Sequence, residues 1–208
     1  MAMPVPALAL TCNGSDALHG GDLRGRLLRH AADAEDPAAL ALAGTVAAAF
    51  EVHGLRRLPL PGLSAADTAT MLHAVFPGAA QALGFDPTVA VVRVEPRFDE
   101  IEDLVALLLD EATPGCPGAH TRWVAHAVAA ASLCSDHLWQ DLRLPSRRVL
   151  GALLEQWFAP LARRNVHDMK WKKFLYKQLC ERSGLSLCRA PSCQQCDDRP
   201  LCFGSEDD

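Results

Sequence analysis

Residues 123–134 read WVAHAVAAASLC, a run in which almost every side chain is apolar. A helix that is apolar on all sides has to lie inside a protein core or a membrane. Because this run is far shorter than the roughly 20 residues that a membrane-spanning helix needs, we expect it to form a buried helix at the centre of a globular core.

Helix signals continue on the amino-terminal side of this run. Asp36 followed by Pro37 is typical of a helix start and predicts an alanine-rich helix that reaches Val52. Ser64 and Asp67 have the spacing of a capping box and predict another helix start. Further helices are expected over residues 22–34 and 99–111.

On the carboxyl-terminal side, Ser146 and Asp168 are expected to cap two more helices, and Gly184 stands where a helix commonly ends. Residues 89–94 alone have the character of a strand, and one strand cannot satisfy its own backbone groups. The sequence therefore predicts an all-α helical bundle with an irregular Cys-rich metal-binding segment. We expect a helical domain over residues 1–184, with 1–20 flexible, and a Cys-rich segment with an acidic tail over 185–208.

The composition is that of an ordinary globular protein. Of the 208 residues, 50% are hydrophobic and 22% are charged, which excludes global disorder. The longest apolar stretch, residues 38–50, is too short to span a membrane, and the amino terminus lacks the basic region of a signal peptide. We therefore expect a cytoplasmic protein without a membrane partner.

Eight cysteines need an explanation other than disulfides, because the cytoplasm keeps thiols reduced. Two of them, Cys134 and Cys180, end apolar stretches and are expected to be buried as small hydrophobic side chains. Two more, Cys12 and Cys116, are also isolated in the sequence. The other four are clustered near the carboxyl end with the spacing C-x4-C-x2-C-x5-C: Cys188, Cys193, Cys196 and Cys202. Such clustering indicates a metal centre.

The spacing within residues 188–202 fits two kinds of metal centre. Two intervening residues let neighbouring thiolates converge on one centre, and structural zinc sites use this arrangement too. The C-x4-C-x2-C opening matches three ligands of the plant-type iron–sulfur spacing. A short zinc knuckle normally includes a histidine, which this segment lacks. The spacing favours an iron–sulfur cluster over zinc and leaves ungrouped thiols as a third interpretation.

Basic residues are concentrated just before the cysteines. The whole chain has a net charge of −5, which argues against a dedicated nucleic-acid binder. Residues 143–189 nevertheless contain eleven Lys or Arg against three acids, and all four lysines lie between Lys170 and Lys177. This charge distribution predicts a basic helix that leads directly into the cysteine segment.

Three interpretations of the basic helix, residues 169–182, remain open. The favoured one is a solvated face, with Lys172, Lys173 and Lys177 pointing to water. The second is that the lysines offset the charge of an anionic cluster and attract an oxyanion such as molybdate or phosphate. The last is a nucleic-acid surface, because aromatic residues alternate with the basic ones; they are Trp171, Phe174 and Tyr176.

His137 and Asp141 are four residues apart and would share one face of a helix. They could act as an additional ligand or as a pair that supports the metal centre, but an interhelical hydrogen bond is the favoured interpretation. The sequence contains no nucleophile elbow, phosphate-binding loop, HExxH or GxGxxG motif. Nothing in it indicates an ordinary enzyme.

Three stretches carry a family resemblance: HLWQDLRL at 137–144, MKWKKFLYKQLCE at 169–181, and the cysteine run that ends in CFG at 202–204. Together they resemble the NifQ family of nitrogen-fixation proteins. The resemblance is strong from His137 onward, looser for residues 99–109 and for the helix that begins at Trp123, and absent from the first sixty residues. Arg143 stands where the family pattern has glycine, which puts the local turn geometry in question.

The resemblance implies a molybdenum-containing iron–sulfur carrier, and not an enzyme, that supplies molybdenum to the iron–molybdenum cofactor of nitrogenase. It implies Cys188, Cys193, Cys196 and Cys202 as the ligands. The implied source is molybdate or a molybdenum-storage protein, and the implied partners are the nitrogenase cofactor scaffold and the nitrogenase Fe protein. The alternative function is a zinc-stabilised module that binds a protein or a nucleic acid through residues 169–182. A redox enzyme is a third and weaker alternative.

Overall fold

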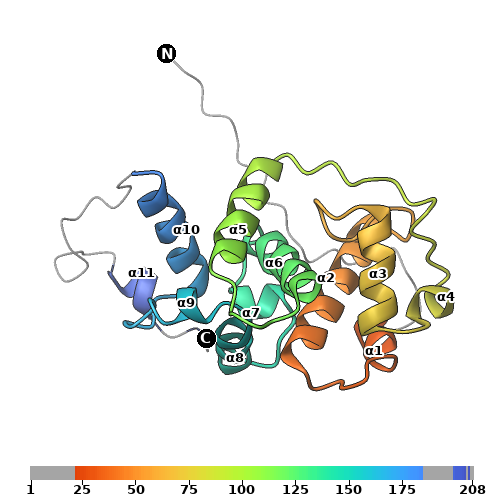
Figure 1. Cartoon of the computed structure of the whole chain (residues 1–208), viewed down its shortest axis with the longest axis horizontal. Helices are drawn as coiled ribbons and strands as arrows, with labels where there is room; N and C mark the ends of the chain where they lie inside the picture. Colours follow the sequence, from red (N-terminus) through yellow and green to blue (C-terminus); the bar gives the residue numbers. More distant parts are fainter. Residues whose placement is uncertain (1–21, 185–198, 205, 207–208) are drawn as a thin grey trace, which may run out of the picture.

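The computed structural model describes residues 22–184, 199–204 and 206. These residues form eleven α-helices and no strand, which confirms the prediction of an all-α fold. The helices are α1 (Leu23–Leu28), α2 (Pro37–His53), α3 (Ala65–Val75), α4 (Ala79–Leu83), α5 (Phe98–Asp110), α6 (Gly118–Ser132), α7 (Leu138–Asp141), α8 (Arg147–Trp157), α9 (Ala159–Ala162), α10 (Trp171–Arg182) and α11 (Arg199–Phe203). Helices α1–α4 and α10–α11 lie at opposite ends of the molecule (Figure 1).

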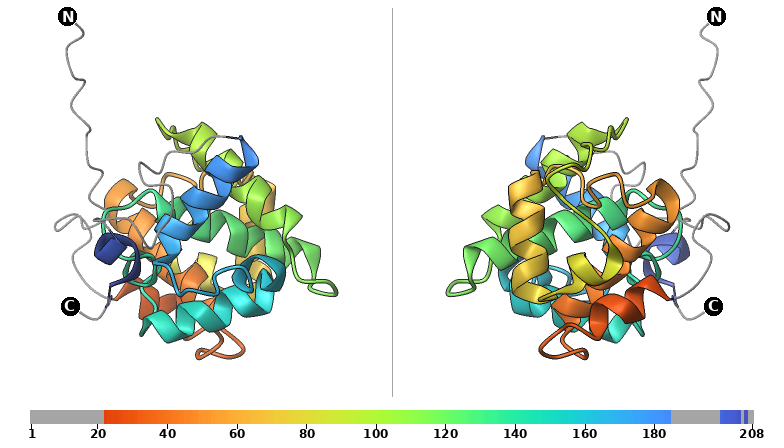
Figure 2. Two further views of the ribbon diagram at one scale, coloured as in Figure 1. Left: turned by 90° about the vertical axis from the view of Figure 1, so that its left-hand side faces the viewer. Right: turned by 90° about the vertical axis from the view of Figure 1, so that its right-hand side faces the viewer.

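Helix α6 forms the centre of the bundle, as its apolar sequence predicts. It packs against α2, α5 and α7 (Figure 2). From Trp123 to Val128 every side chain of α6 is buried, including that of His126. The imidazole Nδ1 of His126 lies 2.9 Å from the carbonyl oxygen of Pro61, and this hydrogen bond satisfies the one strongly polar side chain on this stretch of α6.

The predicted helix starts are confirmed where the capping group is local. Asp36 accepts a hydrogen bond from the backbone N–H of Ala39 at the start of α2. Ser64 and Asp67 form the complete capping box of α3. Ser146 accepts a hydrogen bond from the N–H of Val149 at the start of α8. Side chains within three residues therefore determine each of these starts.

Two expectations about the chain are wrong in detail. The N-cap position of α10 is Lys170, whose side chain makes no capping hydrogen bond, and not Asp168, whose backbone is left-handed (φ 53°). The first helix ends at Leu28 instead of continuing to residue 34. Gly184 does follow the end of α10 with a positive φ of 67°, as expected for a helix-terminating glycine.

Residues 89–94 do not form a strand. They make one isolated parallel bridge, in which the N–H of Val91 donates to the carbonyl of Arg56 and the N–H of Leu58 donates to the carbonyl of Val91. The valines of this segment are exposed. Nor does any helix among the described residues combine the length and the apolar character needed to cross a membrane.

Arg143 has a left-handed backbone (φ 53°), the conformation that favours glycine. Its guanidinium forms a two-pronged ion pair with the carboxylate of Glu51 on α2. The turn also passes close to α2, because a β-carbon added to Gly44 would lie 2.1 Å from the carbonyl oxygen of Leu142. The turn therefore keeps the geometry of a glycine turn, and Arg143 gains an ion pair that offsets its backbone strain.

Comparison of Arg143→Ala with Arg143→Gly separates these two contributions. Both variants lose the ion pair, but only glycine relieves the left-handed strain. We expect urea denaturation to show Arg143→Gly more stable than Arg143→Ala by about 1 kcal/mol. Equal free energies of unfolding would mean that the residue at position 143 is not held in a left-handed conformation.

Helix α10 is attached to α5 through the chain's single tyrosine. The Tyr176 hydroxyl donates a hydrogen bond of 2.9 Å to the Glu100 carboxylate. Burial, followed by this hydrogen bond and the negative charge of Glu100, raises the pKa of Tyr176 to about 12. The folded phenol thus keeps its proton at pH values where an unfolded phenol loses it, so this group makes folding less favourable as the pH rises above 10.

Tyrosinate absorbance measures this contact directly, because no other tyrosine contributes. We expect the native protein at pH 10 to show almost no phenolate absorbance at about 295 nm. The same protein in guanidinium chloride should be about half ionised at that pH. A native titration midpoint near 10 would contradict the buried contact between Tyr176 and Glu100.

Candidate metal-cluster region at the carboxyl end

Three of the four predicted ligands, Cys188, Cys193 and Cys196, lie outside the described residues. The fourth, Cys202, lies in α11 and is half-buried against the side of the core. The described structure therefore shows how the last part of the cysteine segment is held.

One backbone hydrogen bond attaches α11 to the start of α10: the N–H of Lys170 donates to the carbonyl of Cys202 over 2.8 Å. At the end of α11 itself, the N–H of Gly204 donates to the carbonyl of Pro200 over 2.9 Å. A β-carbon at position 204 would lie 2.7 Å from that same Pro200 oxygen, so this close approach requires glycine. The glycine of the CFG motif is therefore needed for the turn that follows Cys202.

A buried carboxylate anchors the chain after α11. Glu206 is 3% exposed. Its oxygens lie 3.2 Å from Nε of Arg147 and 3.6 Å from Nδ1 of His137. Arg147 also donates to the carboxylate of Asp168 (2.7 Å) and to the carbonyls of Asp168 and Met169. One arginine thus holds both the loop before α10 and the end of the chain.

Lys172 does not point to water, contrary to the favoured interpretation of the basic helix. Its ammonium donates to the Asp141 carboxylate and, over 2.8 Å, to the carbonyl of Cys134. The two side chains are 18% and 4% exposed. Burial lowers the pKa of Lys172 and raises the pKa of Asp141, and the hydrogen bond between them opposes both shifts. The attraction between their charges acts in a region of low dielectric and links α10 to α7.

The other lysines of the basic helix differ in their surroundings. Lys173 is exposed, as expected. Lys177 is partly exposed and pairs with Glu181 one turn later on the same helix. Cys134 and Cys180, expected to be buried, are both half-buried. Three lysines were expected to point to water. Of these, only Lys172 makes a contact that links α10 to another helix.

His137 and Asp141 contact different partners. Asp141 makes the expected interhelical hydrogen bond, to Lys172. His137 is the first residue before α7, where its N–H donates to the side chain of Gln140 over 3.0 Å, and its ring faces Glu206. No local sequence pattern indicates the roles of Glu206 and Arg147, because their contacts join positions far apart in the chain.

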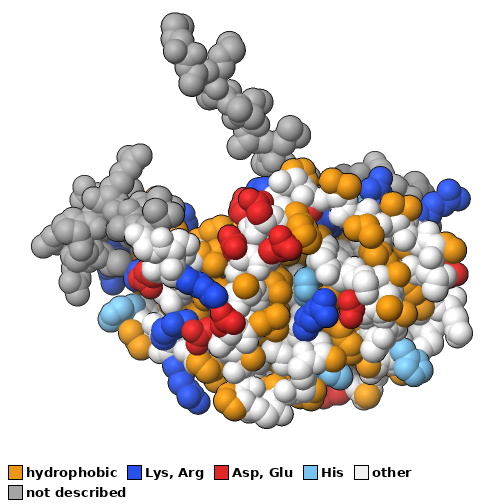
Figure 3. Space-filling model, turned by 45° about the horizontal axis from the view of Figure 1, so that its top comes forward, with side chains coloured by type: hydrophobic (Ala, Val, Ile, Leu, Met, Phe, Trp, Pro, Cys, Tyr) orange, Lys and Arg blue, Asp and Glu red, His pale blue; other side chains and the backbone are white. Residues whose placement is uncertain are grey.

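A cleft of about 570 Å³ opens beside these contacts. It lies between residues 135–140, the start of α10 and α11, and we refer to it as the lysine cleft. Lys170, Lys172 and Lys173 line it, together with Asp136 and Glu206. On the face shown in Figure 3, basic and acidic side chains are interspersed and do not form one continuous basic surface.

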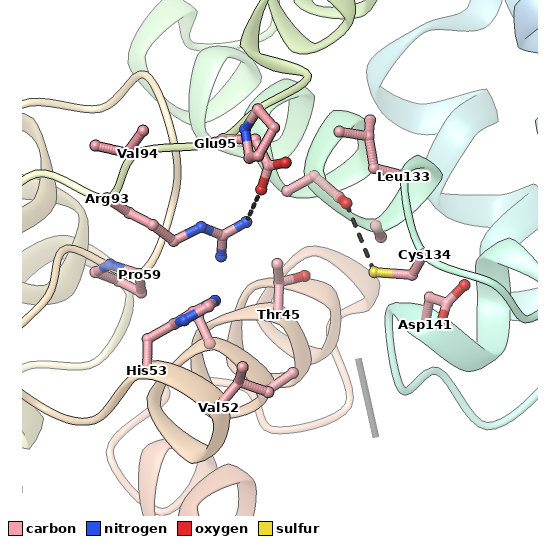
Figure 4. A pocket seen from close by; sticks show the side chains of 15 residues that line it. Thr45, Val52, His53, Pro59, Arg93, Val94, Glu95, Leu133, Cys134 and Asp141 are labelled. Carbon is pink, nitrogen blue, oxygen red and sulfur yellow. Dashed lines mark hydrogen bonds and ion pairs between the residues drawn. The ribbon is translucent and has the colours of Figure 1, made fainter. Parts of the chain in front are cut away.

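A second cavity, of about 120 Å³, lies between α2, the segment before α5 and the end of α6 (Figure 4). Arg93 and Glu95 form an ion pair of 2.8 Å in its wall, and His53 faces it from α2. Burial, followed by the charge of Arg93, lowers the pKa of His53. In the part of the chain that the structure describes, no three His, Cys, Asp or Glu side chains are arranged to hold a metal ion. This cavity is therefore not a preformed metal site.

Comparison with known proteins identifies the family. A model of the NifQ family matches residues 23–204. The chain belongs to the NifQ family. This confirms the resemblance found in the sequence and implies a role in nitrogen fixation.

Named NifQ proteins differ in how much of this chain they match. The Azotobacter vinelandii protein is 52% identical over 113 residues, which are 54% of this chain and 57% of that protein. The Rhodobacter capsulatus protein is 37% identical over 147 residues, 70% of this chain and 76% of that protein. A NifQ homolog from Sinorhizobium fredii is 39% identical over 149 residues, 69% of this chain and 60% of that protein. No solved structure matches.

The anchor of this NifQ-family chain at Glu206 can be tested with Glu206→Gln. Loss of the charge leaves Arg147 with Asp168 alone, and the segment that carries Cys202 should detach locally more often. We expect amide hydrogen exchange in residues 199–204 to accelerate by about ten- to a hundredfold, which corresponds to a loss of about 1.4–2.8 kcal/mol.

Asp168→Asn is the matched control for this prediction. It also removes a carboxylate partner of Arg147, but the Asp168 side chain is 78% exposed, and asparagine tolerates a left-handed backbone. Its exchange rates in residues 199–204 should stay close to those of the wild type. Similar acceleration in the two variants would argue against a special role of the buried carboxylate.

Proposed function

We propose that this chain carries molybdenum on an iron–sulfur cluster and supplies it for assembly of the iron–molybdenum cofactor of nitrogenase. Cys188, Cys193, Cys196 and Cys202 would hold the cluster. Their thiolates are soft ligands suited to iron–sulfur clusters, and the cluster would provide the sulfur-rich surroundings in which molybdenum is held. On this proposal the protein is a carrier and not an enzyme.

The observation that carries the proposal is the attachment of Cys202. The segment between α10 and α11 starts and ends on the same helical bundle, and its end is fixed by the Lys170–Cys202 backbone hydrogen bond and by Glu206. The bundle therefore sets the position of Cys202, and the turn after it requires Gly204. A cysteine held in this way is suited to act as a metal ligand. The lysines nearby would offset part of the negative charge of a thiolate-ligated cluster.

The partners follow from the family resemblance. The source of molybdenum would be molybdate or a molybdenum-storage protein. The nitrogenase cofactor scaffold would receive the metal, with the nitrogenase Fe protein taking part. A half-buried Cys202 at the edge of the bundle is compatible with transfer to another protein, because a ligand in the core would be out of a partner's reach.

The second candidate is a zinc-stabilised interaction module that uses residues 169–182. Four cysteines of this spacing can also bind zinc. Trp171 and Phe174 are buried in the core, however, and Tyr176 is bonded to Glu100. The aromatic side chains that would stack on nucleic-acid bases thus face inward, so a zinc module would have to bind a protein partner through the remaining polar face.

Metal analysis of protein purified without oxygen, from cells grown with molybdate, tests the proposal. We expect iron, acid-labile sulfide and molybdenum in the wild type, and loss of most of all three in Cys193→Ala and Cys196→Ala. Cys116→Ala is the control, because Cys116 is outside the cysteine run in the sequence and its half-buried thiol contacts the carbonyl of Gln156 on α8. It should retain full metal content.

Two results would contradict the proposal. Full iron content in both Cys193→Ala and Cys196→Ala would show that the cysteine run does not hold the cluster. Zinc alone, in protein never exposed to air, would favour the interaction module.

A further inference from the structure

The lysine cleft contains two ammonium groups, those of Lys170 and Lys173, that form no ion pair within the described part of the chain. The charge of Lys172 is balanced by Asp141, and the charge of Glu206 by Arg147. Neither Lys170 nor Lys173 forms an ion pair with any carboxylate of residues 22–184, 199–204 or 206. Asp136 is the other acid in the lining. After these pairs cancel, the described lining keeps two lysines, Lys170 and Lys173, against one acid, Asp136.

Without a bound anion, lysines at the start of α10 lower the stability of that helix. Lys170 stands at the N-cap position of α10 without a capping hydrogen bond, and Lys172 and Lys173 lie in the first turn, which contains no acidic residue. Cations at a helix start are disfavoured because the peptide dipoles place partial positive charge there. An anion held between Lys170 and Lys173 would relieve this repulsion.

The cleft also adjoins the proposed cluster ligand. Lys170 donates its backbone N–H to the carbonyl of Cys202, and Leu201 of α11 lines the cleft. Molybdenum(VI) exists in neutral water as a tetrahedral dianion, which anionic thiolates repel. Cationic groups beside Cys202 would let such a dianion accumulate next to this thiolate.

We propose that the lysine cleft is an entry site for a tetrahedral oxyanion, bound by the ammonium groups of Lys170 and Lys173 beside Cys202. The site chemistry is common to molybdate, tungstate, sulfate and phosphate. The choice of molybdate as the physiological ligand rests on the proposed carrier function. Lys172 is left out of the proposed site because its charge is already balanced by the Asp141 carboxylate.

Equilibrium dialysis of the metal-free full-length chain against molybdate is the direct test. The double variant Lys170→Gln/Lys173→Gln should bind molybdate at least about tenfold more weakly than the wild type, because two charge-assisted contacts are lost. Lys177→Gln is the matched control: it removes a lysine from the same helix, but one whose ammonium pairs with Glu181 and does not line the cleft. Its affinity should equal that of the wild type.

Competition identifies which oxyanion the cleft favours. Sulfate and phosphate should displace molybdate, since they share its shape and charge, and raised ionic strength should weaken all three. Stronger binding of molybdate and tungstate than of sulfate would support the molybdenum assignment. Stronger binding of phosphate than of molybdate would overturn molybdate as the ligand. Undetectable molybdate binding by the wild type, or equal binding by the double variant, would overturn the site.

A second readout separates this inference from the proposed function. In protein isolated from molybdate-grown cells, the double lysine variant should keep its iron and sulfide but contain less molybdenum per iron. If the cysteine variants keep their iron while the lysine variant still loses molybdate binding, the carrier proposal fails and the oxyanion site stands. If the lysine variant keeps a normal ratio of molybdenum to iron, the cleft is not the route of entry.

Discussion

The buried ion pair between Lys172 and Asp141 determines where the carboxyl end of this chain lies. Neither side chain could keep its charge in this largely buried position without the other, because an isolated charge removed from water costs several kcal/mol. The pair fixes the start of α10 relative to α7. Arg147 then joins the loop before α10 to Glu206, and the Lys170 backbone binds α11. Each of these contacts depends on where α10 starts.

Two parts of the molecule have different tasks. The helices around α6 bury their apolar side chains and provide a fixed platform. Cys202 and the lysine cleft lie beside this platform, at the start of α10 and in α11. A carrier benefits from this division, since loading and release of a metal at one end need not disturb the packing of the core.

The sequence predicted what depends on neighbouring residues. The all-α class, the central helix and the caps at Asp36, Ser64 and Ser146 follow from periodicity and from contacts three residues apart. The family pattern has glycine where this chain has Arg143, and the backbone at that position is left-handed, as a glycine position would be. Asp168 and Lys172 were misjudged because their partners, Arg147 and Asp141, lie 21 and 31 residues away in the sequence. The four cysteine ligands rest on their spacing and remain a prediction.

The burial of Glu206 has a practical consequence for handling this protein. Only two residues would separate an affinity tag or reporter fused directly after Asp208 from Glu206, whose carboxylate is 3% exposed and paired with Arg147. A bulky fusion there would compete with the docking of that carboxylate and, through Gly204, with the position of Cys202. Protein for metal or transfer assays is therefore best tagged at a site remote from Glu206.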